Sequence, residues 1–82
     1  MCVTFIELKE EFGKKVRQFR KERGLTQEKL AELAHITPRY VLDIEHGRYG
    51  PSFEVMHNLA QVLDVAPKDL FDFPAVSPTT TS

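Results

Sequence analysis

The 82 residues suffice for one small domain with a thin core, and their 41% hydrophobic and 28% charged content is typical of a soluble globular protein. The net charge of −1, taken as a global number, argues against binding to nucleic acid. A single cysteine, the lack of a long apolar run and an early acidic segment exclude a disulfide framework, a membrane span and a signal peptide, so we expect a cytoplasmic protein.

Helix signals recur along the chain, and no strand-like alternation of apolar and polar residues is sustained. The first predicted helix begins after Thr4, which forms a capping box with Glu7, and Gly24 ends it. Its apolar residues recur near the helical period and are assigned to the core: Phe5, Leu8, Phe12, Val16 and Phe19.

The next two predicted helices lie very close together in the sequence. Thr26 is expected to cap a helix over residues 27–34, and Thr37 to cap a helix that begins at Pro38 and ends at Gly47. Only two residues separate the earlier helix from the cap of the later one, and so short a link holds two helices at a tight angle. This spacing predicts a helix-turn-helix.

A fourth helix capped by Ser52 and a short fifth helix opened by Pro67 complete the predicted order. From Pro74 onward the sequence has neither charge nor periodicity, so residues 74–82 are expected to form a disordered tail. The chain is therefore predicted to be one all-α, five-helix domain over residues 1–73.

Three segments of the sequence resemble a known family. Residues 24–34 (GLTQEKLAELA), 44–48 (IEHGR) and 51–52 (PS) are similar to the lambda-repressor-like or Cro-repressor-type helix-turn-helix family, also called the xenobiotic-response-element type. The resemblance extends over about residues 12–71. It implies a DNA-binding domain that regulates transcription as a homodimer on double-stranded DNA, with the third helix in the major groove.

The sequence departs from the family pattern at two positions. His35 stands in the turn where the family usually has glycine, and if the turn requires a positive φ angle, histidine adopts it at some cost. Pro38 stands where phage repressors of the family often place a polar base-reading side chain. Proline has no donor, so its part would be shape or contact with a thymine methyl group.

The resemblance implies that bases are read by the first turn of the third helix and one turn further on, at Thr37, Pro38, Arg39 and Asp43. The planar fork of Arg39 can donate twice to guanine, although a phosphate contact or a solvated arginine is also open. Asp43 lies four residues after Arg39 on the same face. It could accept a hydrogen bond from cytosine, hold the Arg39 guanidinium in place, or be an exposed acid with no role.

The basic residues are concentrated in the middle of the chain. Residues 12–49 carry a net charge of +4, between −2 over residues 1–11 and −3 over residues 50–82. This distribution could face phosphates, although a solvated helix surface is the alternative. The residues that we expect at phosphates, the last three as weaker candidates, are Gln27, Tyr40, Arg48, Arg17, Lys14 and Lys15.

Two further sets of residues have expected structural roles. The positions of Arg20 and Glu45 pair across the first and third helices in related repressors, so the resemblance implies an ion pair that also orients Arg20 toward the DNA backbone. With no second domain to dimerise, we expect the dimer interface near the fifth helix; its candidates are Leu70, Phe71 and Phe73, with Phe53 in addition, and closure of a small core is the alternative role.

No pattern indicates an enzyme, a cofactor or a small-molecule ligand. His35, His46 and His57 match no zinc spacing, so we expect no metal site. The expected function is a sequence-specific transcription regulator, acting as a repressor on a palindromic operator. The alternatives are a restriction-modification controller-type activator or repressor, an antitoxin-type regulator, and a protein-interaction module that does not bind DNA.

Overall fold

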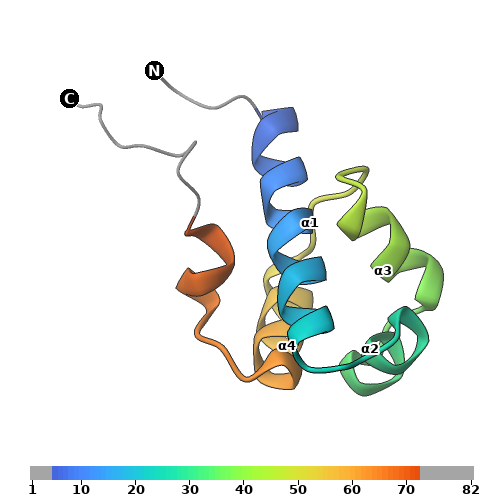
Figure 1. Ribbon diagram of the computed structural model, residues 1–82. Coiled ribbons are helices and arrows are strands. Elements are labelled where there is room, and N and C mark those ends of the chain that lie inside the picture. Colours follow the sequence, from blue (N-terminus) through green and yellow to red (C-terminus); the bar gives the residue numbers. More distant parts are fainter. Residues whose placement is uncertain (1–4, 73–82) are drawn as a thin grey trace.

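The computed structural model describes the backbone of residues 5–72 and the side chains of residues 7–72. This part of the chain contains helices and no strand, which confirms the predicted all-α class (Figure 1). The fifth helix, η1, is a 3-10 helix of five residues rather than an α-helix. The bounds are α1 Phe5–Glu22, α2 Gln27–Ala34, α3 Pro38–Glu45, α4 Phe53–Leu63 and η1 Pro67–Phe71. Some sequence-based assignments lie outside the described residues, namely the cap Thr4, the side chain of Phe5, the dimer candidate Phe73 and the tail over residues 74–82.

The α-helices after α1 begin at the predicted cap residues. In each of them the hydroxyl of the cap residue accepts a hydrogen bond from the backbone N–H three residues further on. Each bond satisfies a donor that the start of a helix otherwise leaves without a partner. The three bonds are Lys29 to Thr26 at 3.0 Å, Tyr40 to Thr37 at 3.1 Å and Val55 to Ser52 at 3.2 Å.

The α-helices of the described chain all end beside a residue in the left-handed conformation. The φ angle is 70° at Gly24 and 74° at Gly47, as the sequence predicted, and 62° at His35 and 58° at Asp64. The residue after each of these four donates its N–H to the carbonyl five residues earlier, at 2.8–3.1 Å, which satisfies a helix-end acceptor. The turn between α2 and α3 thus does require a positive φ angle at His35.

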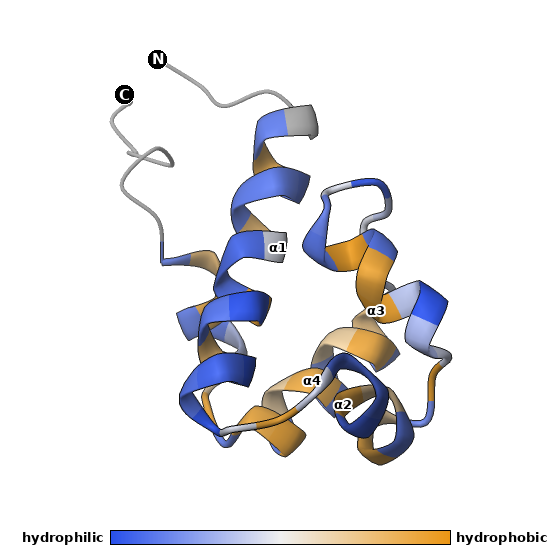
Figure 2. Ribbon diagram, turned by 45° about the vertical axis from the view of Figure 1, so that its right-hand side comes forward, coloured by the Kyte–Doolittle hydropathy of each residue, from blue (hydrophilic) through white to orange (hydrophobic). Residues whose placement is uncertain are grey.

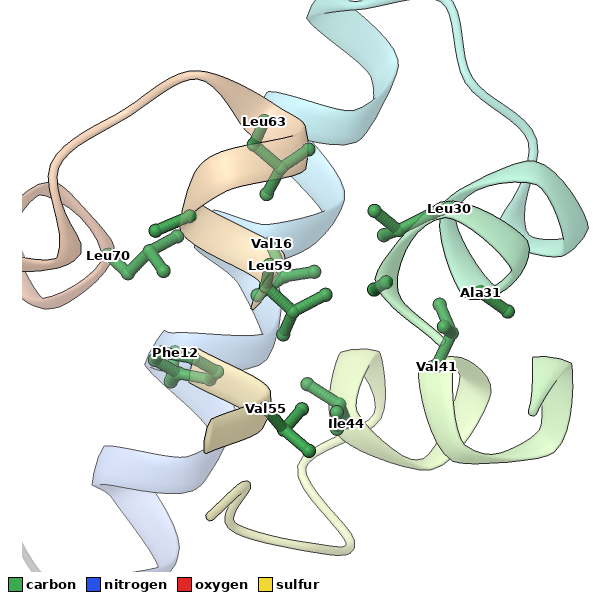
Figure 3. Close-up of a cluster of buried hydrophobic side chains, with 12 residues drawn as sticks. Phe12, Val16, Leu30, Ala31, Val41, Ile44, Val55, Leu59, Leu63 and Leu70 are labelled. Atoms are coloured by element: carbon green, nitrogen blue, oxygen red, sulfur yellow. The ribbon is translucent and has the colours of Figure 1, made fainter. Parts of the chain in front are cut away.

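The core lies where α1 packs on α3, α4 and η1 while α2 packs on α3 and α4. Figure 2 shows the hydrophobic faces of α2, α3 and α4 turned toward the interior and a hydrophilic outer face on α1. None of the described helices is long and apolar enough to cross a membrane. All five helices contribute buried side chains (Figure 3), namely Phe12, Val16, Leu30, Ala31, Ala34, Val41, Ile44, Val55, Leu59, Ala60, Leu63 and Leu70.

Gly13 lets α1 and α3 approach each other closely. A Cβ atom at this position would overlap the backbone carbonyl oxygen of Ile44, and it would lie 2.9 Å from that of Glu45. No flexible side chain could move aside, because both obstacles are backbone atoms. The position of α3 relative to α1 therefore depends on the missing side chain of Gly13, which the periodicity of the sequence did not single out.

Of the described residues expected at the dimer interface, one lies in the core and two lie on the surface. Leu70 is fully buried and closes the core of its own chain, so the expectation that it contacts a partner is replaced by the core role. Phe71 is 38% exposed, and its ring centroid lies 5.1 Å from that of Phe12. Phe53, at the start of α4, is 87% exposed.

Candidate nucleic-acid interface

The helix α3 has one buried face, which α2 and the core cover, and one exposed face. Val41 and Ile44 turn inward and are buried with Leu30 and Ala31 of α2 (Figure 3). The short turn over residues 35–37 holds α2 against α3. The opposite face of α3 and its cap present three exposed residues that the sequence predicted for base contact, Thr37, Pro38 and Arg39.

Asp43, the fourth predicted base-contact residue, is a buried acid between two arginines. Its side chain is 7% exposed. One oxygen, Oδ1, accepts a hydrogen bond from Nη1 of Arg48 at 3.0 Å, and Oδ2 accepts one from Nε of Arg39 at 3.3 Å. This geometry excludes the exposed acid without a role, since both oxygens are engaged.

The arginines keep Asp43 in its charged form. The hydrogen bond from Arg48 is the main cause that lowers the pKa of the Asp43 carboxyl, burial opposes it, and the charge and hydrogen bond of Arg39 add to the lowering. A charged carboxylate accepts stronger hydrogen bonds than a neutral one. The guanidinium of Arg39 is therefore held at one edge while its side chain remains 75% exposed.

Behind this face, Arg20 and Glu45 form an ion pair between α1 and α3. Nε of Arg20 donates to Glu45 Oε2 at 2.7 Å and Nη2 donates to Oε1 at 3.2 Å, in a side-on, two-bond geometry. The side chains are 10% and 2% exposed. The remaining Nη1 donates to the carbonyl of Leu25 at 2.8 Å, so the guanidinium is directed at protein atoms rather than outward at a DNA backbone.

Gln27 extends this pair. Its Nε2 donates to Glu45 Oε1 at 3.0 Å, so the half-buried side chain is tied to the ion pair rather than extended into solvent. An amide nitrogen carries two N–H groups. The second N–H, and the backbone N–H groups at the start of α2, are the donors that Gln27 can offer to a phosphate.

The other predicted phosphate residues lie on the surface. Arg48 is 53% exposed although one of its nitrogens is bonded to Asp43. Arg17 is exposed on α1, and Lys14 is 71% exposed and 3.3 Å from Glu11. Lys15 is half-buried, with Nζ 5.9 Å from the ring centroid of Phe19.

Tyr49 belongs to this face, although no motif in the sequence indicated it. Its ring meets that of Tyr40 edge to face, with centroids 6.4 Å apart. Both tyrosines line a hollow of about 550 Å³ together with Thr37, Arg39, Asp43 and Gly50. The signal available in the sequence was an aromatic residue directly after Gly47-Arg48, where the chain leaves the end of α3.

An exposed third helix, braced by a second helix across a three-residue turn, defines the class of helix-turn-helix DNA-binding domains. The sequence profile described as helix-turn-helix matches residues 16–70, and the chain belongs to this family. It is a helix-turn-helix DNA-binding transcription regulator, as its relatives are.

Restriction-modification controller proteins are among these relatives. The control protein C.BamHI of Bacillus amyloliquefaciens is 39% identical over 66 residues, which is 79% of this chain and 82% of that protein. The crystal structure of the restriction-modification controller protein C.AhdI from Aeromonas hydrophila superposes with a TM-score of 0.75 at 36% identity, covering 77% of this chain and 96% of that one.

A phage repressor and an archaeal transcriptional regulator are also similar to this chain. The immunity repressor protein of Bacillus phage phi105 is 42% identical over 53 residues, which is 65% of this chain but only 37% of that repressor. An HTH-type transcriptional regulator of Methanothermobacter thermautotrophicus is 46% identical over 48 residues, 58% of this chain and 70% of that regulator.

Proposed function

We propose that this regulator acts in the cytoplasm as a homodimer on a palindromic operator and represses transcription by occupying it. The observation that carries the proposal is the exposed face of α3, where Arg39 projects beside a buried carboxylate. Each subunit lays α3 in a major groove, and the two half-sites lie about 34 Å apart.

Base reading is assigned to Arg39, with Thr37 and Pro38 beside it. The contact through Nε leaves the two terminal nitrogens of Arg39 for a guanine, whose O6 and N7 accept two parallel hydrogen bonds. Pro38 contributes shape or a contact with a thymine methyl group. The phosphates on either side are assigned to the charged groups of Arg48 and, on α1, Arg17, and to the neutral donors of Tyr40 and Gln27. Such contacts set affinity and register rather than sequence.

The homodimer and the palindromic operator are proposed together, because two reading helices related by a two-fold axis require an inverted repeat in the DNA. Phe71 and Phe53 are the exposed large hydrophobic residues near the C-terminal helices that can supply an apolar contact.

A restriction-modification controller that activates or represses transcription is the second candidate. The similarity to C.BamHI and C.AhdI over most of their lengths favours this role. The antitoxin-type regulator and the interaction module have no comparable support.

Selection of bound DNA from a random pool, followed by gel-shift titrations across a salt series, tests the proposal. We expect an enriched inverted repeat, and affinity that falls steeply with salt because phosphate contacts release counterions. Arg39→Ala should weaken binding to the selected site more than to random DNA. Failure to enrich any sequence, or binding that ignores salt, would rule out operator recognition.

A further inference from the structure

Asp43 contacts arginines from two segments, α3 and the chain that follows it. Arg39 stands on the reading face of α3, whereas Arg48 follows Gly47, where the chain has left the helix. Each uses a different oxygen of the same carboxylate, at 3.3 Å and 3.0 Å. A single 7% exposed side chain thus connects a base-reading candidate with a phosphate candidate.

The edge of the Arg39 guanidinium that Asp43 contacts determines which nitrogens remain available for a base. Only Nε of Arg39 is bonded to it, and within the described residues the terminal nitrogens have no hydrogen-bond partner. Those two nitrogens form the fork that fits guanine O6 and N7. Holding the Nε edge leaves this fork on a side chain that is 75% exposed and removes rotamer freedom that an unrestrained arginine would lose on binding.

Arg48 in turn fixes the carboxylate. The backbone N–H of Arg48 donates to the carbonyl of Asp43 at 2.8 Å, and its Nη1 donates to Oδ1 at 3.0 Å, so backbone and side chain both tie residue 48 to residue 43. Without this second arginine, Oδ1 would be a buried oxygen without a charged partner. The carboxylate would then be free to turn away from Arg39.

We propose that Arg48 and Asp43 are positioning residues for Arg39, so that a residue beyond the end of the reading helix determines base discrimination. This inference rests on the proposed base reading by Arg39. Arg48 then has two separable effects. Its charge raises affinity for any DNA, and its contact with Asp43 raises the preference for the selected site.

A double-mutant cycle on discrimination tests the proposal. The measured quantity is the ratio of affinities, at one salt concentration, for the selected operator and for the same duplex with the contacted guanine replaced by adenine. An unfolded fraction cancels in this ratio because it lowers both affinities equally. Asp43→Asn and Arg48→Gln should each lower the ratio about two- to tenfold, the effect of freeing one long side chain. In an Arg39→Ala background neither change should lower it further.

Two matched variants separate positioning from charge. Arg17→Gln removes a positive charge that has no contact with Asp43, so it should weaken both duplexes equally and leave the ratio unchanged. Arg48→Lys keeps a donor and should restore part of the ratio that Arg48→Gln loses. An unchanged ratio in Asp43→Asn, or the same loss with and without Arg39, would overturn the positioning role. If Arg39→Ala itself leaves the ratio intact, the proposed base reading fails as well.

Discussion

At the scale of single residues, two buried carboxylates organise the side chains in and behind the candidate interface. Glu45 accepts hydrogen bonds from Arg20 and Gln27 behind α3, and Asp43 accepts from Arg39 and Arg48 at its front. A buried ion pair adds little net stability, but removal of one partner leaves an uncompensated charge. The two acids therefore fix where α3 sits and how its surface is arranged.

Glu45→Ala should lower the free energy of unfolding by roughly 3–5 kcal/mol, since Arg20 would remain buried without its counter-charge. Urea denaturation followed by circular dichroism measures the change. Glu32→Ala is the matched control, because Glu32 is 72% exposed and 3.6 Å from Lys29, a surface pair worth about 0–1 kcal/mol. Equal losses in the two variants would contradict a special role for the buried pair.

The lowered pKa of Asp43 makes stability depend on pH. Because the folded-state pKa lies below the ordinary value of 3.8, the carboxylate contributes stability that is present above that value and is lost as the pH falls through the folded-state pKa. The wild type should therefore lose more stability than Asp43→Asn when urea denaturation is repeated at successively more acidic pH. Parallel curves for the two proteins would show that Asp43 does not titrate in the folded state as inferred.

At the scale of elements, the predictable features were the local ones. The caps Thr26, Thr37 and Ser52 could be placed because a hydroxyl bonds to a backbone N–H only three residues away. The 3-10 geometry over residues 67–71 could not be predicted, since a segment this short shows no periodicity of apolar residues. The spacing of four residues indicated Arg39 as one possible partner of Asp43. The second partner, Arg48, depends on the path of the chain after Gly47, which the sequence pattern does not encode.

The contact between α1 and α3 leads to a prediction at Gly13. Alanine is the better helix former by about 1 kcal/mol, yet Gly13→Ala should destabilise the fold by about 1–3 kcal/mol because its Cβ would overlap backbone of α3. Thermal and urea unfolding measure the change. Lys14→Ala, one residue along and 71% exposed at its side chain, should change stability by less than about 0.5 kcal/mol. A more stable Gly13→Ala variant would contradict the close approach of the two helices.

At the scale of the whole molecule, the distribution of charge along the chain is more informative than the net charge. The net charge of −1 misrepresents the chain, because residues 12–49 carry +4 and contain α2, α3 and most of α1. The acidic residues of the C-terminal third include Asp69 of η1, a helix that lies on the other side of α1 from α3 (Figure 1). The basic charge thus lies mainly in the part of the sequence that contains the reading helix.

The salt dependence of binding can show how many subunits occupy the operator. Each phosphate contact contributes about −0.9 to the slope of log affinity against log salt. Arg17→Gln removes one contact per subunit, so a dimer should lose about two from the magnitude of the slope. Gel-shift titrations on the selected site measure it, with Lys68→Gln in η1 as a control of equal charge change that should leave the slope unaltered. A loss of about one would place a single subunit on the DNA, and no loss would remove Arg17 from the interface.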